Sequence, residues 1–171
     1  MCYNCLTGED MNTVTRSASG MRQNRNRVLN EDDISRIKSD IAAINADEQY
    51  FNINDGPRTG YSDALDIIFV KGDVLPDYDY STHPRDLLST RAVLAHEYYG
   101  HRFYRYTKLR RGAWNDEFRA SYSAAKNAPG LTDKDRVLLI LDAMERAKEA
   151  GVTIRINNFM RRVIYGIDNS I

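Results

Sequence analysis

The chain has 171 residues, of which 42% are hydrophobic and 28% are charged, and this composition is typical of one globular domain. Its 24 basic and 24 acidic side chains balance, so the net charge indicates neither a nucleic-acid partner nor an anionic membrane. No apolar run approaches the ~20 residues that span a bilayer, and the N-terminus lacks the apolar centre of a secretory signal. We therefore expect a cytoplasmic protein without a membrane partner.

Residues 1–29 predict a flexible, polar and basic N-terminal arm, because residues 11–30 contain four arginines and no acid. Cys2 and Cys5 form one C-x-x-C pair near its start. A zinc site of four thiolates needs a second pair, and the chain has only two cysteines, so we expect a reduced pair without a metal. Residues 30–171 are predicted to form a single domain.

The predicted domain begins with a helix from residue 31 to about residue 46, capped by Asn30 and carrying isoleucines at helical spacing. Residues 52–63 are rich in Gly, Pro, Asn and Asp and predict a loop, whereas the apolar residues 64–72 predict the main strand. Pro84 suits the first turn of a long helix that is capped by Thr82 or His83 and closed by Gly112.

Two further helices are predicted downstream of this long helix. The first opens near Asn115 or Asp116 and ends before Pro129, and the second follows a Thr132 cap and stops at Gly151. Residues 152–156 predict a short strand, and residues 157–166 predict a closing helical turn or two. The expected fold class is α+β and mostly helical, with a small sheet that has an edge strand beside the long helix.

The segment "HEYYGH" lies on the long predicted helix and contains two of the three histidines, His96 and His101. Histidines four residues apart on a helix lie ~40° apart on one face and can share a metal ion. Five residues apart, they diverge by ~140° and cannot. A one-residue π-bulge would remove the mismatch, and Gly100 would ease that distortion. We therefore predict a π-bulge and two histidine ligands.

A catalytic zinc site has three protein ligands and one open position. Glu117, on the next predicted helix, is the expected third ligand, and Asp116 is the alternative. A carboxylate that is not a ligand accepts the proton of the attacking water, and Glu97 follows the first histidine in the position for this role.

The HExxGH pattern, together with the D-E-x-R-A segment at residues 116–120, resembles the dipeptidyl-peptidase III family of zinc metallopeptidases. The resemblance implies that His96, His101 and Glu117 hold one zinc ion and that Glu97 is the general base. It covers about a dozen motif positions. Ser121 stands where the family has an acid, and both the chain and the gap between the motifs are shorter. The resemblance therefore implies a zincin-type catalytic core and not the release of dipeptides.

The expected activity is zinc-dependent hydrolysis of a bond in a peptide or protein substrate. In zincins the strand before the motif helix often pairs with an extended substrate, and residues 65–73 are the expected strand by this analogy. A tyrosine often stabilises the oxyanion, and we select Tyr165, with Tyr122 as the alternative.

Two other functions stay open at this point. Residues 102–111 contain five basic side chains, several aromatic ones and no acid, as nucleic-acid-binding surfaces do. Basic residues also stabilise the C-terminal end of a helix, and the balanced net charge favours this second interpretation. The other function is a non-catalytic zincin-like module of a mobile-element, phage or toxin protein, against which the intact Glu97 argues.

Overall fold

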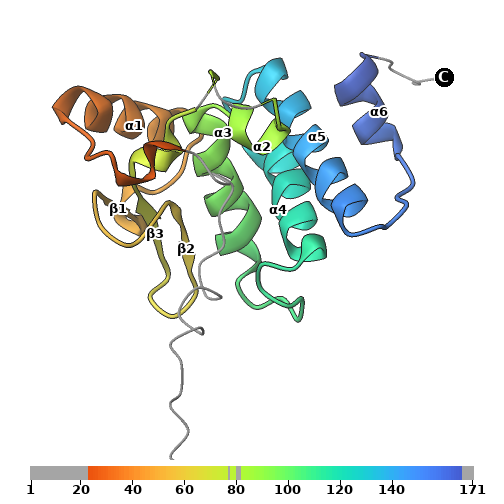
Figure 1. The fold of residues 1–171 in the computed structure, drawn as a ribbon, viewed down its shortest axis with the longest axis horizontal. Helices are drawn as coiled ribbons and strands as arrows, with labels where there is room; N and C mark the ends of the chain where they lie inside the picture. Colours follow the sequence, from red (N-terminus) through yellow and green to blue (C-terminus); the bar gives the residue numbers. More distant parts are fainter. Residues whose placement is uncertain (1–22, 77, 80–81, 167–171) are drawn as a thin grey trace, which may run out of the picture.

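The computed structural model describes residues 23–76, 78–79 and 82–166. Within these residues the chain forms α-helices around one small mixed sheet, which confirms the predicted α+β, mostly helical fold (Figure 1). Most of the predicted arm, including Cys2 and Cys5, lies outside the described residues. The last part of the arm packs on the domain, since Leu29 is buried and Arg27 pairs with Asp33 at 2.6 Å.

The first predicted helix is α1 (Glu31–Ala43). Asn30 accepts a hydrogen bond from the backbone N–H of Asp33, whose side chain accepts one from the Asn30 N–H, and this capping box fixes the start of the helix. Ile37, Ile41 and Ile44 are fully buried, and each contributes about 1.5–3 kcal/mol of hydrophobic stabilisation. The helix ends three residues earlier than predicted.

The sheet contains β1 (Phe51–Ile53), β2 (Gly60–Ser62) and β3 (Ile67–Val70) in the order β1-β3-β2. β1 is parallel and β2 antiparallel to β3. The prediction of a strand within residues 64–72 is confirmed, but the loop prediction for residues 52–63 is wrong at both ends. Strands of three residues beside Gly56 and Pro57 have a loop-like composition, and only pairing with β3 makes them strands.

The long helix predicted from Pro84 is wrong, because it is broken into shorter segments. They are α2 (Pro84–Leu87), α3 (Thr90–Ala95), a π-helix (His96–His101) and a 3₁₀ turn (Arg102–Tyr104). The predicted His83 cap is present, since its side chain accepts the N–H of Arg85. The break follows from Ser89, whose hydroxyl accepts the N–H of Ala92 and starts a new helix.

The C-terminal half contains α4 (Trp114–Asn127), α5 (Asp133–Glu149) and α6 (Asn158–Tyr165). Thr132 caps α5 as predicted, whereas α4 begins at Trp114, upstream of the caps predicted for it. Residues 152–156 form no strand, so that prediction is wrong. Ile154 and Ile156 pack on the core instead of entering the sheet.

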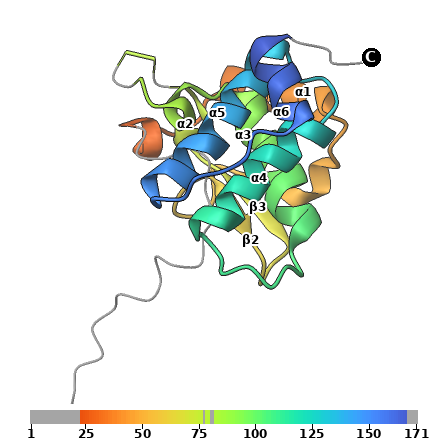
Figure 2. The same cartoon turned by 90° about the vertical axis from the view of Figure 1, so that its right-hand side faces the viewer.

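The helices form successive layers that place the motif at the centre of the domain (Figures 1 and 2). α1 and the sheet lie on one side of α3 and the π-helix, and α4 lies on the other side, packed against α5, with α6 outermost. No helix within the described residues has both the length and the apolar character needed to cross a membrane.

Candidate metal centre

The π-helix brings His96 and His101 onto one face, as predicted from their five-residue spacing. Their Nε2 atoms lie 3.0 Å apart, and both side chains are fully buried. A regular helix would have separated the two rings by ~140°. The wider π turn therefore converts the unusual spacing into a pair of converging imidazoles.

Glu117 completes the cluster from the first turn of α4. Its Oε2 lies 3.4 Å from His96 Nε2, and its Oε1 lies 3.5 Å from His101 Nε2. Zinc–ligand distances of about 2.0–2.2 Å at tetrahedral angles place two ligand atoms about 3.3–3.6 Å apart. The ligand atoms of the three side chains all lie within 4.8 Å of one another, so this buried group could hold a metal ion.

A hydrogen-bond chain fixes the proton position on His96. The Ser121 hydroxyl donates to Asp142 Oδ2 and lies 2.8 Å from His96 Nδ1. A hydroxyl that donates to a carboxylate has only lone pairs left for the ring, so Nδ1 carries the proton. His96 Nε2 therefore presents a lone pair to the cluster, which is the state that a metal ligand needs.

Asp116 lies behind His101 and is not one of the converging ligands. Its Oδ2 is 3.7 Å from His101 Nδ1, on the ring edge opposite to the cluster, and accepts the N–H of Gly112. Its Oδ1 pairs with Arg119 at 2.6 Å. Of the two acids predicted as the third ligand, the structure brings Glu117 to both Nε2 atoms and gives Asp116 a supporting position.

Gly100 allows α4 to approach the motif helix closely. A Cβ atom at this position would lie 2.6 Å from the carbonyl oxygen of Ala120 and 2.7 Å from its Cα. Arg119 donates to the Gly100 carbonyl at 2.8 Å and so joins the same two segments. The sequence analysis assigned Gly100 to easing the π-bulge, and the close helix approach is a second reason for glycine here.

The charges around the cluster favour its ligand-ready state. Burial lowers the pKa of His101 to about 4, although the charges of Glu117 and Asp116 oppose this shift, so the ring is neutral at pH 7. Burial alone would raise the pKa of Glu117, but Arg146 and His101 outweigh it and hold this pKa well below its usual range. Neutral imidazoles and an ionised carboxylate are the donor set that zinc uses.

Glu97 lies in the π-helix and points toward the sheet. It is fully buried, and its Oε2 accepts the backbone N–H of Tyr61 at 2.9 Å. Tyr61 belongs to β2, which is therefore the edge strand beside the motif. The predicted edge strand, residues 65–73, contains β3, which is the central strand, so that part of the prediction is wrong.

The structure does not bring the predicted tyrosines into the cluster. Tyr165 is 59% exposed at the end of α6, which is separated from the motif helix by α4 and α5 (Figure 1). Tyr122 accepts a hydrogen bond from Asn157 at 3.1 Å and stacks on Phe118, so it packs between α4 and the C-terminal segment.

Asp142 and Arg146 are site residues that the sequence analysis missed. Arg146 Nη1 lies 3.0 Å from Glu117 Oε2, and its Nε donates to Asp142 Oδ2 at 2.9 Å. Both side chains lie on the buried face of α5, among Leu139, Ala143 and other core residues. The signal that could have found them was an acid and an arginine four residues apart on a largely apolar helix face.

Two acids of the β2–β3 turn pair with three of the five basic side chains of segment 102–111. Arg102 and Arg105 both pair with Asp66, and Arg111 pairs with Asp63. These contacts attach the segment to the sheet. Such pairing reduces the charge available for phosphate and agrees with the interpretation preferred over nucleic-acid binding.

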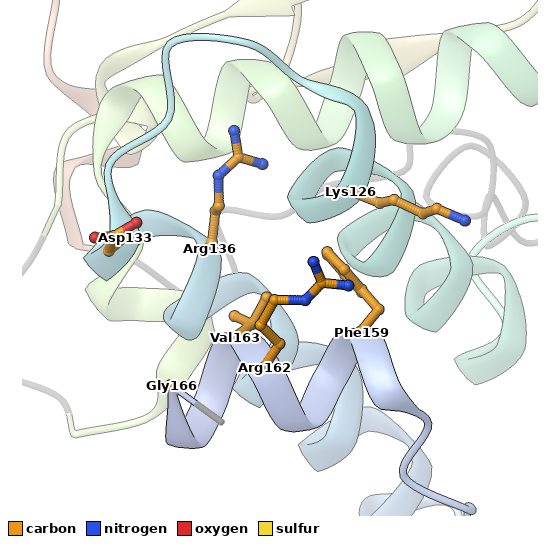
Figure 3. Close-up of a pocket in the computed structure, with 7 residues that line it drawn as sticks. All are labelled: Lys126, Asp133, Arg136, Phe159, Arg162, Val163 and Gly166. Carbon is orange, nitrogen blue, oxygen red and sulfur yellow. The ribbon is translucent and has the colours of Figure 1, made fainter. Parts of the chain in front are cut away.

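A separate cavity of about 670 Å³ lies at the end of the α4–α5 pair that is opposite to the metal centre (Figure 3). Its lining comes from α4, α5 and α6: Lys126, Asp133, Arg136, Phe159, Arg162, Val163 and Gly166. Lys126 follows Glu117 by nine residues, or about 14 Å along α4. Arg136 already donates to the carbonyl groups of Ala125 and Ala128 and so closes the end of α4. The cavity is therefore distinct from the metal centre.

No protein-family model, curated protein or solved structure matches this chain. The assignment of the centre therefore rests on the geometry of the chain itself.

Proposed function

We propose that the chain is a zinc-dependent metallopeptidase. The observation that carries this proposal is the convergence of His96, His101 and Glu117, whose ligand atoms, one from each side chain, all lie within 4.8 Å of one another. Two imidazoles and one carboxylate in such a buried group are a donor set that zinc uses. Two neutral imidazoles and one carboxylate leave a bound ion with net positive charge. The resemblance of the two motifs to dipeptidyl-peptidase III agrees with this set of ligands, and the predicted cytoplasmic location stays a prediction.

When bound, zinc supplies Lewis acidity that polarises a peptide carbonyl and makes water more acidic. Glu97 accepts the proton of the attacking water and transfers it to the leaving amine. The hydrogen bond from the Tyr61 N–H to Oε2 orients Glu97 for this transfer. Ser121 and Asp142 hold His96 in the tautomer that binds metal.

The test compares metal content and peptide cleavage in Glu97→Gln and His101→Ala. Glutamine has the shape of glutamate and can still accept the Tyr61 N–H, so Glu97→Gln keeps about one zinc per chain and loses cleavage. His101→Ala loses zinc as well. Elemental analysis measures the metal, and a library of quenched fluorescent peptides measures cleavage.

Two matched controls stay close to wild type. His83→Ala removes the third histidine, a helix cap, and Glu48→Gln alters an exposed carboxylate that pairs with Lys38. Wild-type protein purified with zinc but holding none would disprove the metal centre. Unchanged cleavage in Glu97→Gln would disprove the mechanism while leaving the metal centre intact.

A non-catalytic metal module is the second candidate function. The observation that favours it is the complete burial of Glu97 together with its hydrogen bond to β2. In such a module Glu97 joins the sheet to the motif helix. Glu97→Gln then leaves the zinc content and the free energy of unfolding unchanged. Wild-type protein that holds zinc cleaves no peptide of the library.

A further inference from the structure

Arg146 is a buried cation, and one of its nitrogens has no acceptor in the described part of the chain. The residue is only 8% exposed, and two of its three nitrogens face Glu117 and Asp142. The third, Nη2, is buried without a hydrogen-bond partner among the described residues. Leaving such a buried donor unpaired is unfavourable, so its position calls for a ligand that brings an acceptor.

The location of Arg146 identifies the kind of acceptor. The guanidinium is planar and rigid, so Nη2 lies beside Nη1, which contacts the proposed metal ligand Glu117. Asp142, which accepts from Nε of Arg146, also accepts from the Ser121 hydroxyl that contacts His96, so the guanidinium is joined to two of the three proposed ligands. Burial alone would lower the pKa of Arg146, but the carboxylates of Asp142, Glu117 and Glu97 raise it, so the side chain stays charged.

We propose that Arg146 binds the carbonyl oxygen of the scissile peptide bond through Nη2 and stabilises the negative charge that develops there. This inference rests on the proposed peptidase function. It gives to Arg146 the role that the sequence analysis assigned to Tyr165.

The charge on the carbonyl oxygen arises during the two steps of hydrolysis. The oxygen of water forms a bond to the carbonyl carbon, the C=O π pair moves onto the carbonyl oxygen, and a water proton moves to Glu97. The C=O bond then re-forms while the C–N bond breaks, and the proton moves from Glu97 to the leaving nitrogen. A donor at the carbonyl oxygen therefore binds the transition state more strongly than it binds the substrate.

The variant that tests this role is Arg146→Lys, since it keeps a positive charge for Glu117 and removes the forked donor. We expect about one zinc per chain and a kcat that falls about 10²–10³-fold, with little change in KM. A phosphinic pseudopeptide of the best library sequence mimics the charged oxygen. Its affinity, measured by calorimetry, should fall by a similar factor. The Glu97→Gln protein and the Glu97→Gln/Arg146→Lys double variant should bind the uncleaved peptide with equal affinity.

The control is Arg91→Lys, which alters a partly buried arginine that pairs with Asp40 at 2.8 Å. Arg146→Lys protein that keeps zinc, kcat and phosphinate affinity would overturn the inference, and so would a variant that loses zinc, because Arg146 would then only position Glu117. Arg146→Gln repeats the test if the lysine variant does not fold. Wild-type protein that holds zinc but neither cleaves peptides nor binds the phosphinate would overturn the proposed function and this inference together.

Discussion

The two groups of ionisable residues around the motif helix differ in burial. His96, His101 and Glu117 are at most 5% exposed, and each is held by partners from α4 or α5. The basic segment 102–111 lies at the surface, where Tyr106 is 84% exposed, and three of its four arginines pair with acids of the β2–β3 turn. Buried polar groups need defined partners, whereas exposed ion pairs are worth little. The comparison teaches that burial, and not local charge, makes a chemically defined site.

The strongest way to break the buried group is Gly100→Ala. The added Cβ would meet the backbone of Ala120, which cannot move without displacing α4 and Glu117 with it. We expect a loss of more than about 3 kcal/mol of unfolding free energy, measured in urea, and loss of zinc. Gly151→Ala is the control, since it adds a Cβ in open space at a φ of +70° and costs about 1 kcal/mol. Equal losses of unfolding free energy in the two variants would contradict the close approach of α4 to the motif helix.

Acid should destabilise the metal-free protein through His101. The pKa of its buried ring is lowered from 6.5 to about 4, so below pH 6.5 the unfolded chain binds a proton that the folded protein excludes. The contribution of the neutral ring to the free energy of unfolding is fully present above pH 6.5. The free energy of unfolding then falls by on the order of 3 kcal/mol between pH 6.5 and pH 4. Urea unfolding of chelator-treated protein measures this slope. His101→Gln should flatten it, and His83→Ala should not, while a slope that survives His101→Gln would assign it to another group.

Ser121→Ala should weaken zinc binding without removing it. The variant takes away the acceptor that fixes the His96 proton on Nδ1, and loss of such a support typically lowers metal affinity 10–100-fold. Competition with a chromophoric chelator measures the affinity. Ser123→Ala, a buried serine on the same helix, is the matched control. Equal zinc affinities in the two variants would show that the tautomer is fixed in another way.

The smallest effect is expected at the surface group. Asp66→Asn removes the negative charge shared by Arg102 and Arg105. We expect the free energy of unfolding to fall by less than about 1 kcal/mol and the zinc content to stay unchanged. Thermal unfolding and elemental analysis measure the two quantities. A loss of zinc in this variant would show that the surface contacts also position the metal centre.

The sequence predicted elements well where the signal is local. Asn30 and Thr132 cap the helices that they were expected to cap, and the isoleucines of α1 face the core. The spacing of His96 and His101 was sufficient to predict the π-helix, because only a wider turn lets both rings face one ion. These features depend on neighbouring residues, so the order of residues determines them.

Tertiary contacts decided the features that the sequence analysis missed. β1 and β2 exist because they pair with β3, and the predicted long helix breaks at Ser89, whose hydroxyl donates to Asp135 of α5 and caps a new helix. Tyr165 lies on an outer helix, while Arg146, far along the chain from the motif, reaches Glu117.

The sequence by itself determined the fold class, the Asn30 and Thr132 helix caps and the pair of histidines in the buried centre. Only the tertiary structure decided that Glu117 converges with them while Asp116 supports His101, and that Ser121, Asp142 and Arg146 surround the group. The physical reason is that a ligand's role depends on distances of about 3 Å between side-chain atoms that belong to different helices. Such distances follow from how closely helices pack, as at Gly100 and Ala120, and not from the order of residues along one of them.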